Sequence, residues 1–145
     1  MAKQLSVFTE NRPGRLKAIT ETLYQSDKTI NILAFTIQDR GEFGLVKLLV
    51  DKPEAAQIAL TEKGFACALR EVIVIEAKDK PGNLCRLTTA LSDNNINIVD
   101  AHGYVVTLGK KGLCCLDCDK KLSEAAKVLE QAGFKVLSDE ELNAF

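Results

Sequence analysis

The sequence contains a single histidine and no run of apolar residues long enough to cross a bilayer. Its longest apolar runs, residues 44–50 and 72–75, have the length of β-strands. Neither sign of charge dominates, because 19 Lys and Arg face 20 Asp and Glu and leave a net charge of −1. No basic stripe offers nucleic acid an electrostatic footprint. We therefore expect neither a nucleic acid nor a membrane as a partner.

The N-terminal sequence MAKQLSVF also lacks the basic segment and long apolar segment of a secretory signal peptide. The chain has five cysteines, an odd number, which favours free thiols in a reducing compartment. These two features predict a cytoplasmic protein.

Three cysteines form a C-C-x-x-C run, Cys114, Cys115 and Cys118. Side chains on a strand alternate between faces, so Cys115 and Cys118 are expected to point in opposite directions. A zinc site needs four convergent ligands, and no second C-x-x-C or H-x-x-x-H accompanies this run. We therefore expect no metal and no cofactor. Cys67 and Cys85 are expected to be small buried residues.

The sequence gives little support for catalysis. His102 has no recognisable frame of a nucleophile and an orienting carboxylate around it. No G-x-G-x-x-G fingerprint of a dinucleotide site occurs. We expect no enzyme activity, and an enzyme that uses the thiols is a remote alternative. His102 is expected to be an ordinary strand residue, with a ligand-lining role as the alternative.

The chain repeats itself in order. The segment 10–16, with Pro13-Gly14, reappears as 78–84, with Pro81-Gly82, 68 residues later. Ile-Asn-Ile at 30–32 reappears at 96–98, and further matches join Gly44-Leu45 to Gly112-Leu113 and residues 60–65 to 129–134. Such a repeat favours two small domains over one larger one. The predicted domains are residues 1–70 and 71–145.

Each copy predicts the same order of elements. A β-branched strand precedes Pro-Gly, and a helix with apolar residues spaced by three and four follows it. Two strands around a tight turn come next, then an Ala-rich helix that ends at a glycine, and then a last strand. The predicted ranges are strands 5–9, 30–38, 43–50, 72–77, 96–108 and 113–118, helices 54–63 and 123–132, and last strands from Phe65 and Phe134.

Strand, helix, two strands, helix, strand is the split βαβ or ferredoxin-like order. The fold class is therefore α/β of the α+β sandwich type, with two βαββαβ units. We expect their antiparallel sheets to join side by side into eight strands. The second strand of each unit is expected to form the joining edge, because exposed edges invite pairing.

The Pro-Gly segment is the informative loop. Proline suits the first turn of a helix, and glycine beside it lets a ligand approach the backbone. The N–H groups of residues 14–16 and 82–84 then point out of a helix N-terminus, which attracts a carboxylate or phosphate. Asn11 or Asp79, with Asn31 or Asn97, can accept from an ammonium. The alternative is that these residues only form good turns.

These motifs, Asx-x-Pro-Gly-x-Leu after a strand and Ile-Asn-Ile opening the second strand, resemble the ACT domain in both halves. The first copy is most similar to the serine-sensing ACT domain of D-phosphoglycerate dehydrogenase. That resemblance implies a ligand between two side-by-side domains, held by the loop Asx of one and the strand Asn of the other. Thr9 and Ala77 stand where that family has a histidine, so the identity of the amino acid stays open.

The resemblance implies an allosteric sensor that binds a free amino acid and acts on a partner protein or as a homodimer. A structural or protein-interaction module without ligand is the alternative. We expect the site with the Asp79 carboxylate to select a free amino acid over a plain carboxylic acid. The predicted ligand-binding residues are Asn11, Arg12, Pro13, Gly14, Arg15, Leu16, Asn31, Asp79, Lys80, Pro81, Gly82, Asn83, Leu84 and Asn97.

Overall fold

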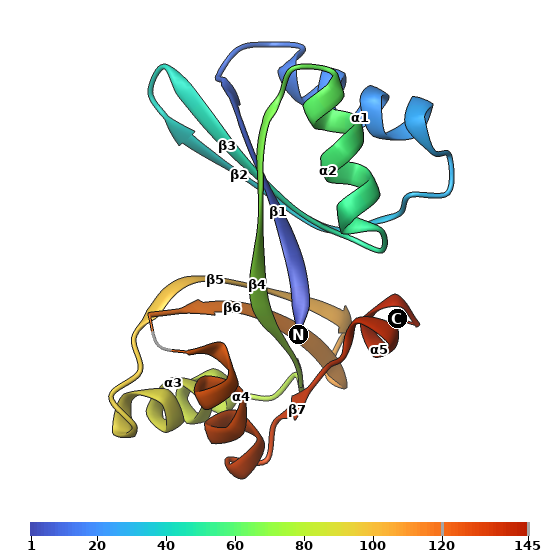
Figure 1. Cartoon of the computed structure of the whole chain (residues 1–145). Helices are drawn as coiled ribbons and strands as arrows, with labels where there is room; N and C mark the ends of the chain where they lie inside the picture. Colours follow the sequence, from blue (N-terminus) through green and yellow to red (C-terminus); the bar gives the residue numbers. More distant parts are fainter. Residues whose placement is uncertain (120, 145) are drawn as a thin grey trace. The chain divides into compact units, whose positions relative to one another are not determined.

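The computed structural model (Figure 1) describes residues 1–119 and 121–144. The chain divides into two compact units. The N-terminal unit contains residues Lys3–Arg70, and the C-terminal unit contains the residues from Glu71 onward together with the first two residues. Each unit is described by itself below.

The N-terminal unit has a four-stranded sheet in the order β2-β3-β1-β4. Strands β1 and β2 both run antiparallel to β3. Helices α1 and α2 cover one face of this sheet (Figure 1). The elements are β1 (Ala2–Glu10), α1 (Arg15–Ser26), β2 (Ile32–Arg40), β3 (Phe43–Val50), α2 (Pro53–Glu62) and the first part of β4 (Ala66–Ala77).

The C-terminal unit repeats this plan. The second part of β4 pairs antiparallel with β6 and with β7, and β5 pairs antiparallel with β6. Helices α3 and α4 lie on one face of these strands (Figure 1). The elements are α3 (Asn83–Asp93), β5 (Ile98–Thr107), β6 (Lys111–Cys118), α4 (Leu122–Gln131), β7 (Lys135–Val136) and α5 (Asp139–Asn143). The prediction of two βαββαβ units is confirmed.

Strand β4 corrects one expectation. The last strand of the first copy and the first strand of the second are a single strand of 12 residues, so the described residues form seven strands rather than eight. The second strands do not make the expected joining edge. Strand β2 pairs with β3 alone and β5 with β6 alone among the described residues, so each is an edge strand of its own unit.

Alternation of side chains along the strands builds both cores. In the N-terminal unit, Leu5 and Val7 point toward the helices and pack with Ile19 and Leu60. In the C-terminal unit the equivalent inward positions of β4 pack under its two helices, with Leu129 fully buried. Each unit therefore has a hydrophobic core of its own. The residues at the centre of the second core are Ile73, Ile75, Leu87, Leu91, Leu116, Ala125 and Leu129.

The helix ends follow the predicted glycine chemistry. Gly64 and Gly133 have φ values of +85° and +83°. The N–H of the following residue, Phe65 or Phe134, reaches back to the carbonyl of Leu60 or Leu129 at 3.0 Å. This is the hydrogen bond that closes a Schellman motif. A capping box between Ser138 and Glu141 opens α5.

One burial prediction for α3 is wrong. Cys85 is exposed, and its neighbour Leu84 is also 68% exposed. Both residues lie in the first turn of α3, before the helix reaches the core that buries Leu87 and Leu91. Cys67 is half-buried. No helix among the described residues has the length and apolar character needed to span a membrane.

Candidate ligand-binding site

The Pro-Gly segment forms the same tight turn in both units. Gly14 and Gly82 have φ/ψ values of 89°/−13° and 83°/−10°. With proline before them, these are the angles of a type II turn, which requires φ above zero at its third residue. A Cβ at either glycine meets nothing within 4 Å, so backbone conformation demands glycine there. The prolines therefore precede the helices and do not occupy the first helical turn, which corrects the sequence interpretation.

In each unit, the turn itself engages one of the three N–H groups that were expected to be free for a ligand. The N–H of Arg15 donates to the carbonyl of Arg12 at 3.3 Å, and that of Asn83 to Lys80 at 3.2 Å. No side chain caps α1 or α3. The N–H groups of Leu16 and Leu84, and of the residue after each, find no acceptor among the described residues. Each helix N-terminus thus keeps donors for an anion.

The loop Asx residues differ between the units. The backbone N–H of Asn11 donates to Glu42 in the β2–β3 turn, and that of Asp79 to Lys110 in the β5–β6 turn. The Asp79 carboxylate also accepts from the N–H of Gly109 at 2.6 Å through one oxygen. The Asn11 side chain has no such bond within the described residues. Asp79 therefore holds its hairpin against the loop and keeps one oxygen for another donor.

Asn31 and Asn97 directly precede β2 and β5, and both are exposed. Their backbone N–H groups donate to the carboxylates of Asp51 and Asp119 at 2.9 and 2.8 Å. The return bond runs from each Asp N–H to the Asn carbonyl. The aspartates fix these turns, so the amide side chains of Asn31 and Asn97 stay available to a ligand.

Within one unit, the loop and the strand Asn lie at opposite ends of the first helix. The loop and Val105, near the end of β5, line one cavity of about 250 Å³, whereas Asn97 lines another with Ser92 and Asp119. Helix α3 separates the two, and its 11 residues span about 16 Å. The structure therefore does not bring Asp79 and Asn97 together inside the C-terminal unit.

The remaining predicted side chains surround the loops. Arg12 forms an ion pair with Glu10 at 2.8 Å. Arg15 donates to the Thr9 hydroxyl at 2.9 Å and lies over the Phe65 ring, 5.0 Å from its centroid. Both guanidinium groups are therefore engaged within their own unit.

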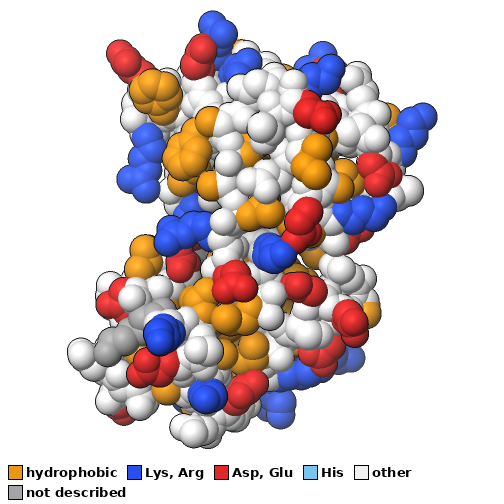
Figure 2. Space-filling view, viewed as in Figure 1, with side chains coloured by type: hydrophobic (Ala, Val, Ile, Leu, Met, Phe, Trp, Pro, Cys, Tyr) orange, Lys and Arg blue, Asp and Glu red, His pale blue; other side chains and the backbone are white. Residues whose placement is uncertain are grey.

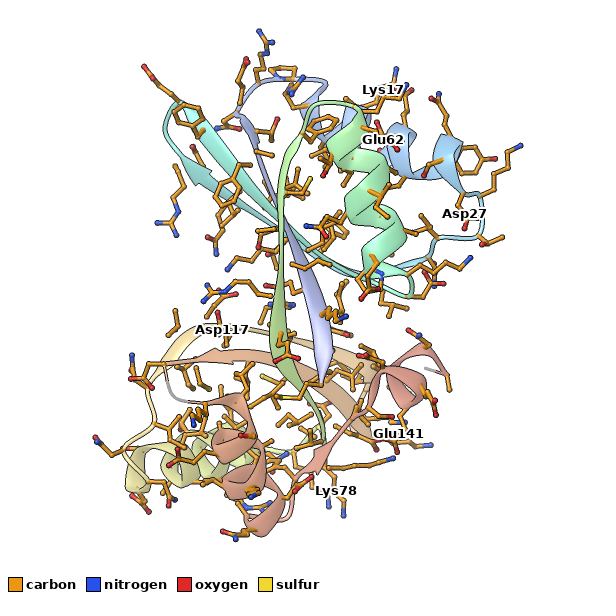
Figure 3. All side chains as sticks on the ribbon, in the orientation of Figure 1. Lys17, Asp27, Glu62, Lys78, Asp117 and Glu141 are labelled. Atoms are coloured by element: carbon orange, nitrogen blue, oxygen red, sulfur yellow. The ribbon has the colours of Figure 1, made fainter. Side chains whose placement is uncertain are left out.

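In the C-terminal unit, Asn83 donates to the carbonyl of Lys78 at 2.9 Å. Lys78, labelled in Figure 3, lines the loop cavity together with Lys80, Asn83 and Leu84. The loop cavity also has walls that the motif analysis missed, from Leu87, Gly103, Tyr104, Val105, Leu113 and Cys114. Gly103 gave a signal, because glycine inside a strand marks close approach of a ligand or backbone.

His102 is half-buried on β5 and does not line the loop cavity. Within residues 1–119 and 121–144, no group of His, Cys, Asp and Glu side chains gathers to hold a metal ion. Side chains of both charge signs are spread over the face shown in Figure 2. This distribution agrees with the mixed charge of the sequence.

The thiols of the C-C-x-x-C run are chemically quiet. Cys115 and Cys118 are buried, and burial raises the pKa of Cys114 to about 11. With this pKa, Cys114 is almost entirely protonated at pH 8. It therefore reacts slowly, because only the thiolate reacts quickly. We predict that iodoacetamide at pH 8 labels the exposed Cys85 first, and that labelling of Cys114 increases as the pH approaches 11. Mass spectrometry of the folded and urea-unfolded chain measures this. Labelling of Cys114 and Cys85 at equal rates in the folded chain would contradict it.

Comparison with protein-family models identifies the family to which the chain belongs. The family model for the ACT domain pair matches residues 1–145. A comparison with curated proteins found no match.

Solved structures share the whole fold. Protein BT0572 from Bacteroides thetaiotaomicron is 27% identical with a TM-score of 0.90, covering 99% of this chain and 96% of that one. The ligand-free regulatory subunit of aspartate kinase from Thermus thermophilus is 15% identical with a TM-score of 0.65, covering 90% and 92%. The corresponding subunit from Thermus flavus is also 15% identical, with a TM-score of 0.58 over 90% and 92%. At these low identities the aspartate kinase subunits show a shared fold.

Proposed function

Because the chain belongs to the ACT domain pair family, we propose that it is a regulatory protein that binds a free amino acid and catalyses no reaction of its own. Its ligand is held at the Pro-Gly loops. Binding of the amino acid alters how the chain interacts with a partner protein that it regulates.

One observation carries this proposal: both units keep the same uncapped helix N-terminus behind a type II Pro-Gly turn. The free N–H groups there match the carboxylate of an amino acid, and the helix dipole adds to the attraction. The available amide oxygens of Asn31 and Asn97 match its ammonium. A ligand with both charged ends uses both features, whereas a metal or a nucleotide does not.

The strand Asn has to come from another unit, because the loop and the Asn of one unit are separated by a helix. Strands β2 and β5 are edges of their sheets. When two edges pair antiparallel, the start of one strand faces the end of the other. Such a pairing brings a strand Asn to the loop of a unit in another copy of the chain, as in a homodimer. In such a pairing the loop residue Asn11 would face Asn97, and Asp79 would face Asn31.

The relatives support a regulatory role. Two structures of the same fold are named regulatory subunits of aspartate kinase, an enzyme of amino-acid metabolism. The likeness of the first copy to the serine-sensing domain of D-phosphoglycerate dehydrogenase suggests the same mode of binding. We propose that the remaining oxygen of Asp79 accepts from the ligand's ammonium, which selects a free amino acid over its deaminated analogue.

The test is the thermal stability of the whole chain with each of the twenty amino acids, one at a time. An amino acid at 100 times its dissociation constant should raise the free energy of unfolding by about 2.7 kcal/mol. Asn31→Ala should reduce this gain, while Asn94→Ala, whose side chain bonds to the Ala90 carbonyl, should not. If no amino acid stabilises the chain, it is an interaction module without ligand.

A further inference from the structure

The cavity beside the Pro-Gly loop of the C-terminal unit has an apolar floor. Its lining includes Leu87, which is buried, and Cys114 of β6, which packs against the same core. Leu84 also lines the cavity, and 68% of its surface is exposed. The charged residues of the lining are Lys78 and Lys80, which are exposed, and Asp79, which is half-buried. The cavity therefore offers polar groups at its mouth and apolar surface inside.

Glycine opens this cavity on the strand side. Gly103 lines the cavity and pairs with Cys114 of β6. A Cβ placed on Gly103 meets only the carbonyl oxygen of Leu113 within 4 Å, at 3.5 Å. A side chain at this position would extend into open space, which is the space of the cavity.

The N-terminal unit carries isoleucine at the equivalent position. Ile37 pairs with Val46 of β3, and Val46 precedes Cys114 by 68 residues, the spacing that also separates the two prolines. Pairing across the strands puts Ile37 on the same face as Val46, which belongs to the core under the helices. Its branched side chain therefore stands where the C-terminal unit has its opening.

The first turns of helices α1 and α3 also differ in how far their leucine is buried. Leu16 packs against the core of the N-terminal unit, whereas its equivalent Leu84 is left exposed. In the N-terminal unit, Asp39 stands at the position that the apolar Val105 occupies in the wall of the C-terminal cavity. Its carboxylate accepts from the N–H of Gly41 at 2.8 Å. The loop of the N-terminal unit therefore has Ile37 and Asp39 beside it, where that of the C-terminal unit has Gly103 and Val105.

We propose that the cavity at Gly103 receives the side chain of the bound amino acid, and that this side chain is aliphatic. Gly103 is the residue that admits it, and Leu84, Leu87 and Val105 bury it. Burial of apolar surface favours such a side chain, while an acidic or hydroxyl side chain would lose water against the apolar floor. In the N-terminal unit Ile37, which is 51% exposed, stands at the equivalent position, and the loop there takes no ligand, so each chain binds one. This inference rests on the proposed amino-acid function.

Calorimetry with L-leucine, L-serine and L-aspartate tests the inference on the whole chain. L-leucine should bind most tightly, with one molecule per chain. Gly103→Ile, which copies the other unit, should weaken leucine binding at least tenfold. Ala101→Ile is the matched control, because Ala101 lies two residues away on the same face, outside the cavity lining. The equivalent position already holds Phe35 in the other unit, and this variant should bind as the unchanged chain does.

A second variant guards against a folding defect in Gly103→Ile. Leu84→Asp changes an exposed residue in the first turn of a helix, where an acidic side chain is tolerated, and it should also weaken leucine binding tenfold. Two bound molecules per chain, tighter binding of serine or aspartate, or full leucine affinity in both variants would overturn the inference while the amino-acid function stands. Binding of none of the twenty amino acids would overturn the function itself.

Discussion

Replacing Leu60 or Leu129 with alanine should lower the free energy of unfolding by about 3 kcal/mol, within the usual range of about 2–5 for buried leucines. Both side chains are completely buried, each in the core of its own unit. The substitution removes apolar contacts and leaves a cavity that the close-packed core closes only in part. Urea denaturation followed by circular dichroism measures the change.

The control is Ile58→Ala, on the same helix as Leu60 but with 59% of the isoleucine exposed. It should change the free energy of unfolding by less than about 0.5 kcal/mol, as surface substitutions usually do. A loss below 1 kcal/mol for both buried leucines would contradict the two separate cores described above.

Replacing Gly82 with alanine should lower stability by about 1–2 kcal/mol, because an L-residue pays that much to enter the left-handed region. Gly82 has a φ of 83° at the third position of the type II turn. A turn that relaxes to a negative φ moves the N–H groups at the start of α3. We therefore also expect amino-acid binding to weaken at least tenfold.

Gly14→Ala is the matched variant, since Gly14 has a φ of 89° in the same turn of the other unit. It should lose a similar amount of stability but leave amino-acid affinity unchanged, because we propose that the ligand occupies the C-terminal loop. Chemical denaturation and calorimetry of both variants separate the two effects. Unchanged stability in both would show that the turn does not require a left-handed residue.

The sequence predicted the fold well because the signals are local and occur twice. Alternation placed β3 at Phe43–Val50, and Gly64 and Gly133 marked the helix ends. Local patterns could not show that one strand continues from the first unit into the second. The run from Ala66 to Ala77 has no turn residue within it, and only strand pairing reveals that both sheets use it.

The site was harder to predict, since hydrogen bonds between distant segments decide it. Asp79 was chosen as a ligand residue from the motif, but its bond to Gly109 depends on a hairpin 30 residues away. The Pro-Gly pair fits both a helix start and a type II turn, and only the backbone angles separate them. Gly103 belongs to no motif, and its meaning emerges from the comparison with Ile37 in the other unit.

The most direct test of the central claim follows backbone amide resonances of the ¹⁵N-labelled chain during titration with the amino acid that stabilises it most. The account predicts that the amides of Gly82, Leu84 and Cys85 shift most, together with that of Gly103, and that the shifts saturate at one ligand per chain. Saturable binding with these four amides unmoved, and the largest shifts elsewhere, would contradict a ligand held at the Pro-Gly loop.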